Sequence, residues 1–404
     1  MKEKPKFEKS LAIMRFALLL SGLKTQKSNS YSLFDIFIDN YLHYMNIVVL
    51  YTVVGGEVYW IIHGMWTGEK FIDLSYCLPL IVISVVSTIK CFFLYKKRDK
   101  VRFLINSLKE IHPENEETEL VNEGNEISDE TNEIAEVTNE NEIVEDTVTM
   151  LSTIINFLMV ISTGVLIMFC LAPVMMMFVK YLMTGEMVIM YPYVVRYWFD
   201  IYDTVYWPLI YLHQVIATGI VCTNLFGTEL LFYVLCSYIE MHFRILGNKF
   251  VKVNSWSQDR ISEEIVGAVR KQQLLISLVN LGEMLYSKSA LLHMVTSSFL
   301  ICLSAFNITV AKDMNTLFAF IMFLLLSLSQ VSLLCFFGDK LMESVNIKTN
   351  SSAFIGLDFE IFLFRSQKPC KLTAANFADL NLRAFTTWST FRQKNKLKKN
   401  QNLM

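Results

Sequence analysis

Residues 151–178 have the sequence LSTIINFLMVISTGVLIMFCLAPVMMMF, which contains no charged side chain. A helix needs about 20 mostly apolar residues to cross the hydrocarbon core of a bilayer. The stretch therefore predicts a membrane-spanning helix. Hydrophobic residues make up 53% of the 404-residue chain and charged residues only 18%, which is the balance of a membrane protein rather than of a soluble domain.

Five further stretches have the length and apolar character of membrane spans. They are 40–62, 73–95, 205–238, 286–311 and 316–338. The fourth and fifth of the six spans continue at helical spacing beyond membrane length, the fifth backwards through 272–292, and such overhanging helices can pack into a bundle outside the membrane. The sequence therefore predicts an all-α, polytopic membrane protein with seven transmembrane helices, of which the seventh, at 372–392, is marginal.

Lys and Arg gather on one side of these spans. Seven lie before residue 28, five in 96–102 and six in 244–271, whereas the segments on the other side hold only Lys70, Lys180, Arg196 and Lys312. Cytoplasmic loops are enriched in Lys and Arg. The N-terminus and the even-numbered loops are therefore predicted to be cytoplasmic, and the overhanging helices to form a cytoplasmic anchor bundle.

The chain divides into five expected segments. The N-terminal segment contains an apolar run, 11–23, that predicts an amphipathic helix on the inner membrane surface. The segment 113–147 holds 14 acidic residues and no Lys, Arg or aromatic residue, which predicts a disordered cytoplasmic insert. The segments are 1–39 (cytoplasmic N-terminus), 40–112 (spans one and two with a basic flank), 113–147 (acidic insert), 148–371 (spans three to six with helix extensions) and 372–404 (candidate seventh helix and basic tail).

Motifs of catalysis and metal binding are missing from the sequence. It has no glycine-rich phosphate loop, no GxSxG or HExxH motif and no paired carboxylates, so no catalytic residue is assigned and no enzyme is expected. The eight cysteines lie mostly inside apolar runs without a CxxC pattern, and the six histidines are scattered. Neither a disulfide framework nor a metal site is predicted, and no cofactor or nucleic acid partner is expected.

Polar residues at membrane depth are the informative ones. Glu57 lies in the first span behind Gly55-Gly56, where an ionisable residue is a functional candidate, although a place near the outer interface or a pairing with a neighbouring helix also fits. His213 and Gln214, at the outer start of span four, belong either to an aromatic belt or to the wall of a ligand pocket. Asn307 opens a glycosylation sequon, expected to stay unused so close to the membrane.

Several stretches resemble one family, the insect odorant receptors. QLLISLVNLGEMLYSKSALLHMVTSSFLICLSAF (273–306) is similar to their fifth helix, and LLCFFGDKLMESVNI (333–347) to the inner end of their sixth. RSQKPCKLTAANF (365–377) is similar to the signature that leads into their seventh helix, and YPYVVRYWFDIYDTVYWPLIYLHQ (191–214) resembles their second outer loop and fourth helix. The resemblance runs over nearly the whole chain and agrees with a cytoplasmic N-terminus.

The resemblance implies a tuning subunit of an odorant-gated, non-selective cation channel. Such a subunit joins a shared co-receptor subunit in a hetero-tetramer, in the plasma membrane of olfactory sensory neurons and surrounded by membrane lipid. A small volatile organic ligand would bind in the outer half, among spans two, three, four and six. On this basis we expect ligand-binding residues at Met168, Ala172, Tyr206, Tyr211, His213 and Thr218. The pore-lining residues of the seventh helix would be Asn381, Phe385 and Trp388.

The seventh helix departs from the family pattern. Its first half carries Asp379 and Arg383, and one central Asp or Arg costs about 3 kcal/mol on the insertion scale. Five basic residues follow within 392–399, so that the segment is either a polar pore-lining helix or an altered one that does not span.

Three other classes of membrane protein remain as alternatives. A gustatory receptor is the nearest, but its seventh-helix signature is missing. A G-protein-coupled receptor would need an outside N-terminus. A transporter would show internal symmetry, and none is found in the sequence.

Overall fold

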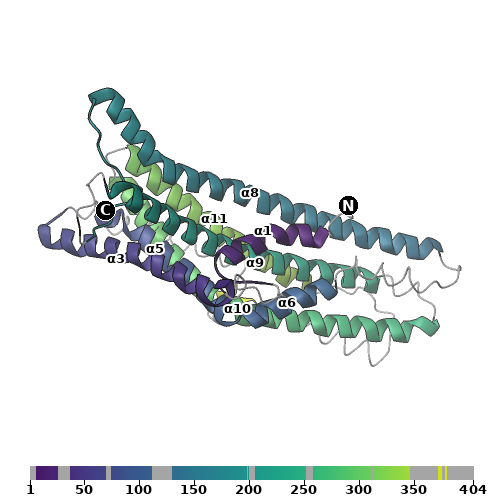
Figure 1. Ribbon diagram of the computed structural model, residues 1–404. Helices are drawn as coiled ribbons and strands as arrows, with labels where there is room; N and C mark the ends of the chain where they lie inside the picture. Colours follow the sequence, from purple (N-terminus) through teal and green to yellow (C-terminus); the bar gives the residue numbers. More distant parts are fainter. Residues whose placement is uncertain are drawn as a thin grey trace, which may run out of the picture.

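The computed structural model describes residues 6–25, 37–69, 74–111, 130–197, 199, 205–251, 258–310, 314–345, 372–374 and 378–379. In chain order the elements are α1 (Lys6–Leu20), the π-helical turn η1 (Ile38–Leu42), α3 (His43–Thr67), α5 (Leu78–Lys96), α6 (Arg98–Glu110), α8 (Glu130–Thr184), α9 (Trp207–Val251), α10 (Gln258–Val310), α11 (Met314–Val345), β1 (Thr373–Ala374) and β2 (Ala378–Asp379). Figure 1 shows the long helices lying side by side in one elongated bundle.

Among the described residues, six helices are long and apolar enough to cross a membrane, and each overlaps one of the six spans predicted from the sequence. They are Asn40–Thr67, Leu78–Lys96, Asn139–Thr184, Trp207–Lys249, Ile265–Val310 and Leu317–Val345. At 1.5 Å per residue, a helix as long as the fifth is about 70 Å long, more than twice the hydrocarbon thickness of about 30 Å. We call the excess the overhang: residues 130–150 of α8, 239–251 of α9 and 258–285 of α10.

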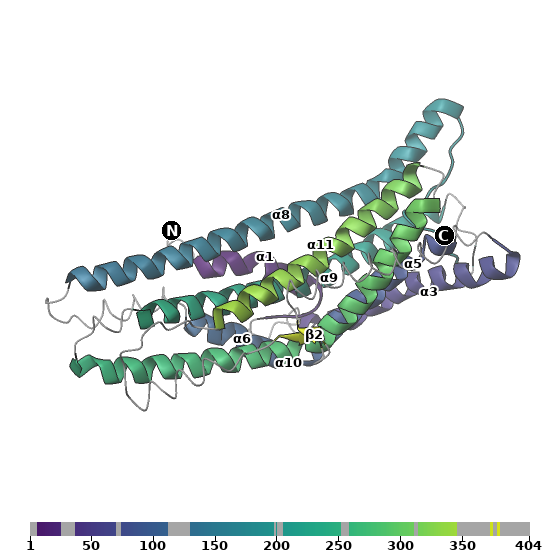
Figure 2. The same cartoon turned by 180° about the vertical axis from the view of Figure 1, so that it is seen from behind.

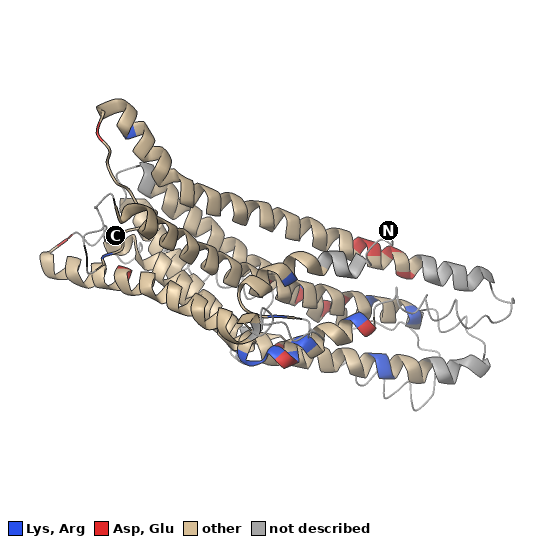
Figure 3. Ribbon diagram, in the orientation of Figure 1, with Lys and Arg blue, Asp and Glu red and all other residues tan. Residues whose placement is uncertain are grey.

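Charged side chains separate the overhang from the rest of the bundle. Figure 3 shows most Lys, Arg, Asp and Glu on the half of the molecule that contains the overhang, and few on the half that contains α3 and the outer end of α8. The predicted extension of the spans into a helical bundle is therefore confirmed. Figure 1 also shows the C-terminal end of α8 leaning away from the bundle. Pro173 lies inside this helix and removes one of its backbone hydrogen bonds.

Helix α9 is the centre of the bundle. Its residues 230–243 are buried on every face, as expected for a stretch that is apolar almost all round. The ring of Tyr233 stacks on Phe337 of α11 with 4.6 Å between centroids, and Tyr286 of α10 meets Phe232 edge-on at 5.0 Å. The main core therefore lies where α9, α10 and α11 meet, around the start of the overhang.

The structure corrects the expected position of the N-terminal helix. Leu11, Met14 and Leu18 of α1 are fully buried in the main core, against α9 and α8. A side chain at Gly227 of α9 would place its Cβ 3.2 Å from the backbone N of Leu18, so glycine permits the close approach. α1 therefore belongs to the bundle and is not a helix lying only on the membrane surface.

The acidic insert is also different from the expectation in the part that is described. Residues 130–147 are the first turns of α8, not a disordered segment, while 113–129 lie outside the described residues. Ile143 and Val144 are buried in the main core. Two carboxylates of this segment pair with basic residues of α9: Asp146 lies 3.5 Å from Arg244 and Glu140 lies 3.2 Å from Lys249. Burial of a few apolar residues, with paired charges, is what orders this segment.

The signature segment near the C-terminus forms a short antiparallel pair. Thr373 is opposite Asp379 and Ala374 is opposite Ala378, and Figure 2 shows β2 beside the bend of α10. The candidate seventh helix therefore does not begin at residue 372 as predicted. The segment from residue 380 onward, with Asn381, Phe385 and Trp388, lies outside the described residues, so that a spanning seventh helix stays a prediction.

Candidate functional site

The loop at 191–197 folds back onto α3, α8 and α9 at the end of the bundle away from the overhang. Tyr193 and Val195 are buried in a second apolar cluster with residues of α3 and α9. The backbone N–H of Arg196 donates to the carbonyl of Gly56 at 3.2 Å. A Cβ at Gly56 would lie 2.2 Å from Cγ1 of Val195, so the glycine is what lets the loop dock on α3.

Tyr193 ties this loop to α9. Its hydroxyl donates to the carbonyl of Gln214 at 2.6 Å and lies 3.1 Å from Oγ1 of Thr218. The Gln214 side chain returns a hydrogen bond from Nε2 to the Tyr193 carbonyl at 3.4 Å. Phe169 of α8 stacks on the Tyr193 ring at 5.7 Å. One side chain of the loop therefore contacts two spans at once.

His213 is the second connection, and its tautomer follows from its neighbours. Nε2 lies 2.9 Å from Oγ1 of Thr52 on α3, and Nδ1 lies 3.1 Å from the hydroxyl of Tyr197. The Thr52 hydroxyl already donates to the carbonyl of Val49 at 2.7 Å, so it must accept from Nε2–H. A neutral imidazole then has Nδ1 as its acceptor. Tyr197 supplies the proton, because burial raises the pKa of Tyr197 to about 12 and keeps it protonated.

The structure brings together some of the expected ligand-binding residues. His213 and Thr218 lie in the contacts just described, and the Tyr211 hydroxyl donates to the carbonyl of Cys170 on α8. Tyr206 is linked to them by a chain of rings: Tyr206 lies 5.7 Å from Phe199, which stacks on Tyr197 at 5.5 Å.

Two expected residues lie elsewhere. Met168 is 65% exposed and Ala172 is also exposed on the outside of α8. Their neighbours Phe169 and Cys170 contact the loop and α9 instead. Met168 and Ala172 therefore lie in the segment of α8 that contacts the loop, but on a different face of the helix. Whether any of these residues binds ligand stays a prediction.

Sequence reasoning missed four residues of this site, all with a signal in the chain. Thr52 lies four residues before Gly56, and Phe169 follows Met168 directly. Tyr193 and Tyr197 belong to an aromatic-rich loop, and such side chains are rarely left without a hydroxyl partner when buried.

Glu57, the functional candidate of the first span, is buried, with an exposed fraction of 2%. Within the described part of the chain it forms no ion pair with a neighbouring helix. It lies directly after the docking point of the loop at Gly56, and it remains a polar group whose role the geometry does not assign.

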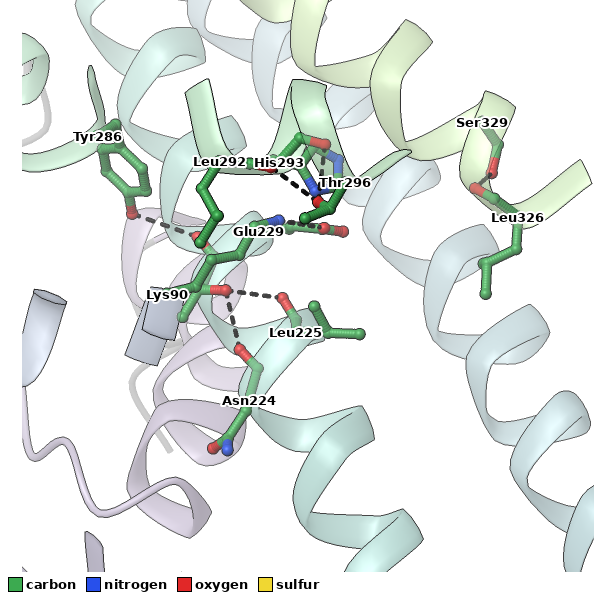
Figure 4. Close-up of polar contacts among 11 residues, drawn as sticks. Lys90, Asn224, Leu225, Glu229, Tyr286, Leu292, His293, Thr296, Leu326 and Ser329 are labelled. Atoms are coloured by element: carbon green, nitrogen blue, oxygen red, sulfur yellow. Dashed lines mark hydrogen bonds and ion pairs between the residues drawn. The ribbon is translucent and has the colours of Figure 1, made fainter. Parts of the chain in front are cut away.

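A second polar cluster lies deeper, where α5, α9 and α10 meet (Figure 4). Nζ of Lys90 lies 3.0 Å from Oε1 of Glu229, and the two side chains are only 7% and 14% exposed. His293 of α10 is buried beside them. Tyr286 donates to the carbonyl of Thr228 at 3.2 Å in the same region. The sequence signal was one charge of each sign inside two predicted spans.

The overhang carries its own ion pairs. Glu240 of α9 is buried between Lys340 of α11 at 3.5 Å and Arg244 at 3.7 Å. Arg244 continues to Asp146 of α8, and Lys249 pairs with Glu140 at 3.2 Å. The contacts join α8, α9 and α11 within the charged half of the bundle.

Sites for a metal or for a glycan do not emerge from the residues that the structure describes. No group of three His, Cys, Asp or Glu side chains could hold a metal there, and none of the seven cysteines described forms a disulfide. Asn307 of the sequon is fully buried, and its Oδ1 accepts a hydrogen bond from Ser75 at 2.7 Å. A glycan cannot be attached to a side chain in that position.

The comparisons with known proteins point to one family. The family model described as 7tm Odorant receptor matches residues 70–350. Odorant receptor 85b of Drosophila melanogaster is 24% identical over 340 residues, which cover 80% of this chain and 81% of that protein. Odorant receptor 85c of the same organism is 22% identical over 85% of this chain and 86% of that protein.

Solved structures show the same fold. The insect olfactory receptor OR5 from Machilis hrabei matches with a TM-score of 0.73 at 16% identity, over 96% of both chains. Its complex with eugenol matches with a TM-score of 0.74 over 98% of both chains. Because the family model covers more than half of the sequence, the chain belongs to the insect odorant receptor family, as a multi-pass membrane protein.

Proposed function

We propose that this odorant receptor is the tuning subunit of an odorant-gated, non-selective cation channel. It would assemble with a shared co-receptor subunit in a hetero-tetramer, in the plasma membrane of olfactory sensory neurons. The ligand would be a small volatile organic molecule. Support comes from the family and from the solved relative whose complex with eugenol has the same fold.

The observation that carries the proposal is the site around the docked loop. It joins α3, α8 and α9 through a few directional contacts, at His213, Tyr193 and Tyr211, among aromatic and apolar side chains. A mostly apolar surface with a small number of fixed polar groups is what a small organic ligand needs. We place the ligand beside Tyr211, His213 and Thr218, next to the ring of Tyr206.

Ligand binding would act on these contacts between helices. A ligand shifts a closed–open equilibrium only by its difference in affinity for the two states. Tyr211 connects α9 to α8, and His213 connects α9 to α3, so a ligand that rearranges either contact changes the relative position of the spans. The proposed readout of that change is a pore lined by Asn381, Phe385 and Trp388.

The test compares dose–response curves of odorant-evoked current with the co-receptor co-expressed. Tyr211→Phe removes one hydrogen bond and His213→Ala removes two, and we expect about tenfold or larger shifts in potency. Leu212→Ala is the matched control, because Leu212 lies between them and is 55% exposed. If the odorant has the same potency on all three variants as on the unaltered receptor, at equal surface delivery, then the ligand does not bind at this site.

A second experiment addresses the pore. An epitope placed after Met404 is stained in intact and in permeabilised cells, with a second tag at 186–188 to confirm surface delivery. Staining of intact cells is expected, because a spanning seventh helix brings the C-terminus outside. Staining only after permeabilisation would contradict the pore assignment and leave a receptor with six spans.

A further inference from the structure

Two lysines at the junction of α5 and α6 converge on one residue of α10. Nζ of Lys97 donates to the carbonyl of Met284 at 2.7 Å, and Nζ of Lys100 lies 3.3 Å from the Met284 sulfur. Lys288 follows Met284 by four residues on α10, and side chains four apart lie on the same face of a helix. Three lysines therefore gather at one place: Lys97 from the junction of α5 and α6, Lys100 from α6 and Lys288 from α10.

These three charges have no carboxylate partner within the described residues. The acidic groups nearest in sequence are used elsewhere: Asp99 pairs with Arg102 at 3.3 Å, and the Glu283 carboxylate accepts from the backbone N–H of Thr373 at 2.7 Å.

The lysines also repel one another. Burial, together with the neighbouring ammonium groups of Lys100 and Lys288, lowers the pKa of Lys97. A bound anion would relieve this repulsion.

The position of the lysines identifies the source of such an anion. Lys97 comes directly after α5, whose apolar helix Leu78–Lys96 has the length of a membrane span. On α10, Met284 and Lys288 lie at the expected start of span five at 286. Both helices therefore leave the hydrocarbon at this level, on the side that the Lys and Arg distribution assigns to the cytoplasm. The cytoplasmic leaflet carries anionic phospholipids.

We propose that Lys97, Lys100 and Lys288 bind the phosphate of an anionic phospholipid headgroup from the cytoplasmic leaflet. An ammonium group has three donors, so Lys97 can keep its bond to the Met284 carbonyl while it donates to a phosphate oxygen. The headgroup would hold the α5–α6 junction against α10 at Met284. The preceding residue of α10, Glu283, is the one that binds Thr373 of the signature segment. This lipid site is separate from the odorant site. The proposal depends only on the predicted orientation of the chain, which puts the α5–α6 junction on the cytoplasmic side.

The test measures lipid binding by the full-length receptor, solubilised in detergent and titrated with phosphatidylserine or phosphatidylcholine, by native mass spectrometry. We expect tighter binding of phosphatidylserine, weakened about fivefold for each lysine changed to Gln and about a hundredfold for all three. Replacement of all three by Arg keeps the charge and should keep binding. Lys96→Gln is the matched control, because its ammonium lies over the Phe92 ring instead.

Three outcomes would overturn the proposal. Equal affinity for phosphatidylserine and phosphatidylcholine would show that the site does not recognise an anionic headgroup. An equal loss in Lys96→Gln and Lys100→Gln shows a general surface charge effect and no site. Displacement of the lipid by millimolar inorganic phosphate identifies a site for a soluble anion. Should the triple Gln variant fail to fold, Lys100→Gln alone decides, since that side chain is exposed.

Discussion

The buried ion pair between α5 and α9 makes a sharp prediction about stability. Lys90→Met keeps a long apolar stem but removes the ammonium group 3.0 Å from the Glu229 carboxylate. With side chains only 7% and 14% exposed, water replaces little of the lost partner. Removing one member of a buried pair costs about 3–5 kcal/mol, because the other charge is left uncompensated.

The size of the effect can be checked in detergent by following thermal unfolding through tryptophan fluorescence. The shift of the unfolding midpoint is the change in free energy divided by the unfolding entropy, which is about 2.1 cal/mol/K per residue. For a chain of this length, a loss of 3–5 kcal/mol therefore lowers the unfolding temperature by about 3–6 °C. Changing both partners, as in Lys90→Met with Glu229→Leu, should restore most of the loss, since apolar replacement of a whole buried pair is often neutral.

Lys96→Met is the matched control on the same helix. Its ammonium lies 4.7 Å from the centroid of the Phe92 ring and pairs with no carboxylate among the residues that the structure describes, so its loss should cost less than about 1 kcal/mol. The reasoning is refuted by equal transitions for Lys90→Met and Lys96→Met. It is also refuted if the double replacement is as unstable as Lys90→Met alone.

Three further changes test the contacts of the loop, the sequon and the signature segment. Gly56→Ala puts a Cβ 2.2 Å from Val195 and should destabilise by about 1–3 kcal/mol, whereas Gly55→Ala, with open space around it, should not; thermal unfolding compares them. Asn307→Gln should leave the gel mobility unchanged before and after glycosidase, because the side chain is buried. Glu283→Gln weakens the acceptor for the signature segment, and faster proteolysis of the C-terminal epitope tag is expected.

Several features followed from composition, and the structure or the family bears them out. The six spans, and the extension of the fourth and fifth beyond membrane length, were predicted correctly because length and apolar character decide membrane crossing without any partner. The family assignment replaces the gustatory-receptor, G-protein-coupled-receptor and transporter alternatives. On α9, the expected residues Tyr211, His213 and Thr218 do contact the loop or the neighbouring spans, since polar groups in an apolar helix need partners.

The helix faces could not be predicted, and α8 shows why. Residues 151–178 are apolar on every side, so no polar face indicates which side meets the protein and which meets lipid. Met168 and Ala172 were chosen, whereas Phe169 and Cys170 make the contacts. In lipid an apolar side chain is equally acceptable inside and outside, so the hydrophobic periodicity that orients a helix in water is weak here.

Thus the sequence by itself determined the approximate positions and the helical class of the six spans, and the family of the receptor. Only the tertiary structure decided that α1 is buried against α9, that residues 130–147 continue α8, and that Lys90 pairs with Glu229. The physical reason is the same in each case. A span is a local property of about 20 residues, but the burial of a face or of a charge depends on which distant helix lies beside it.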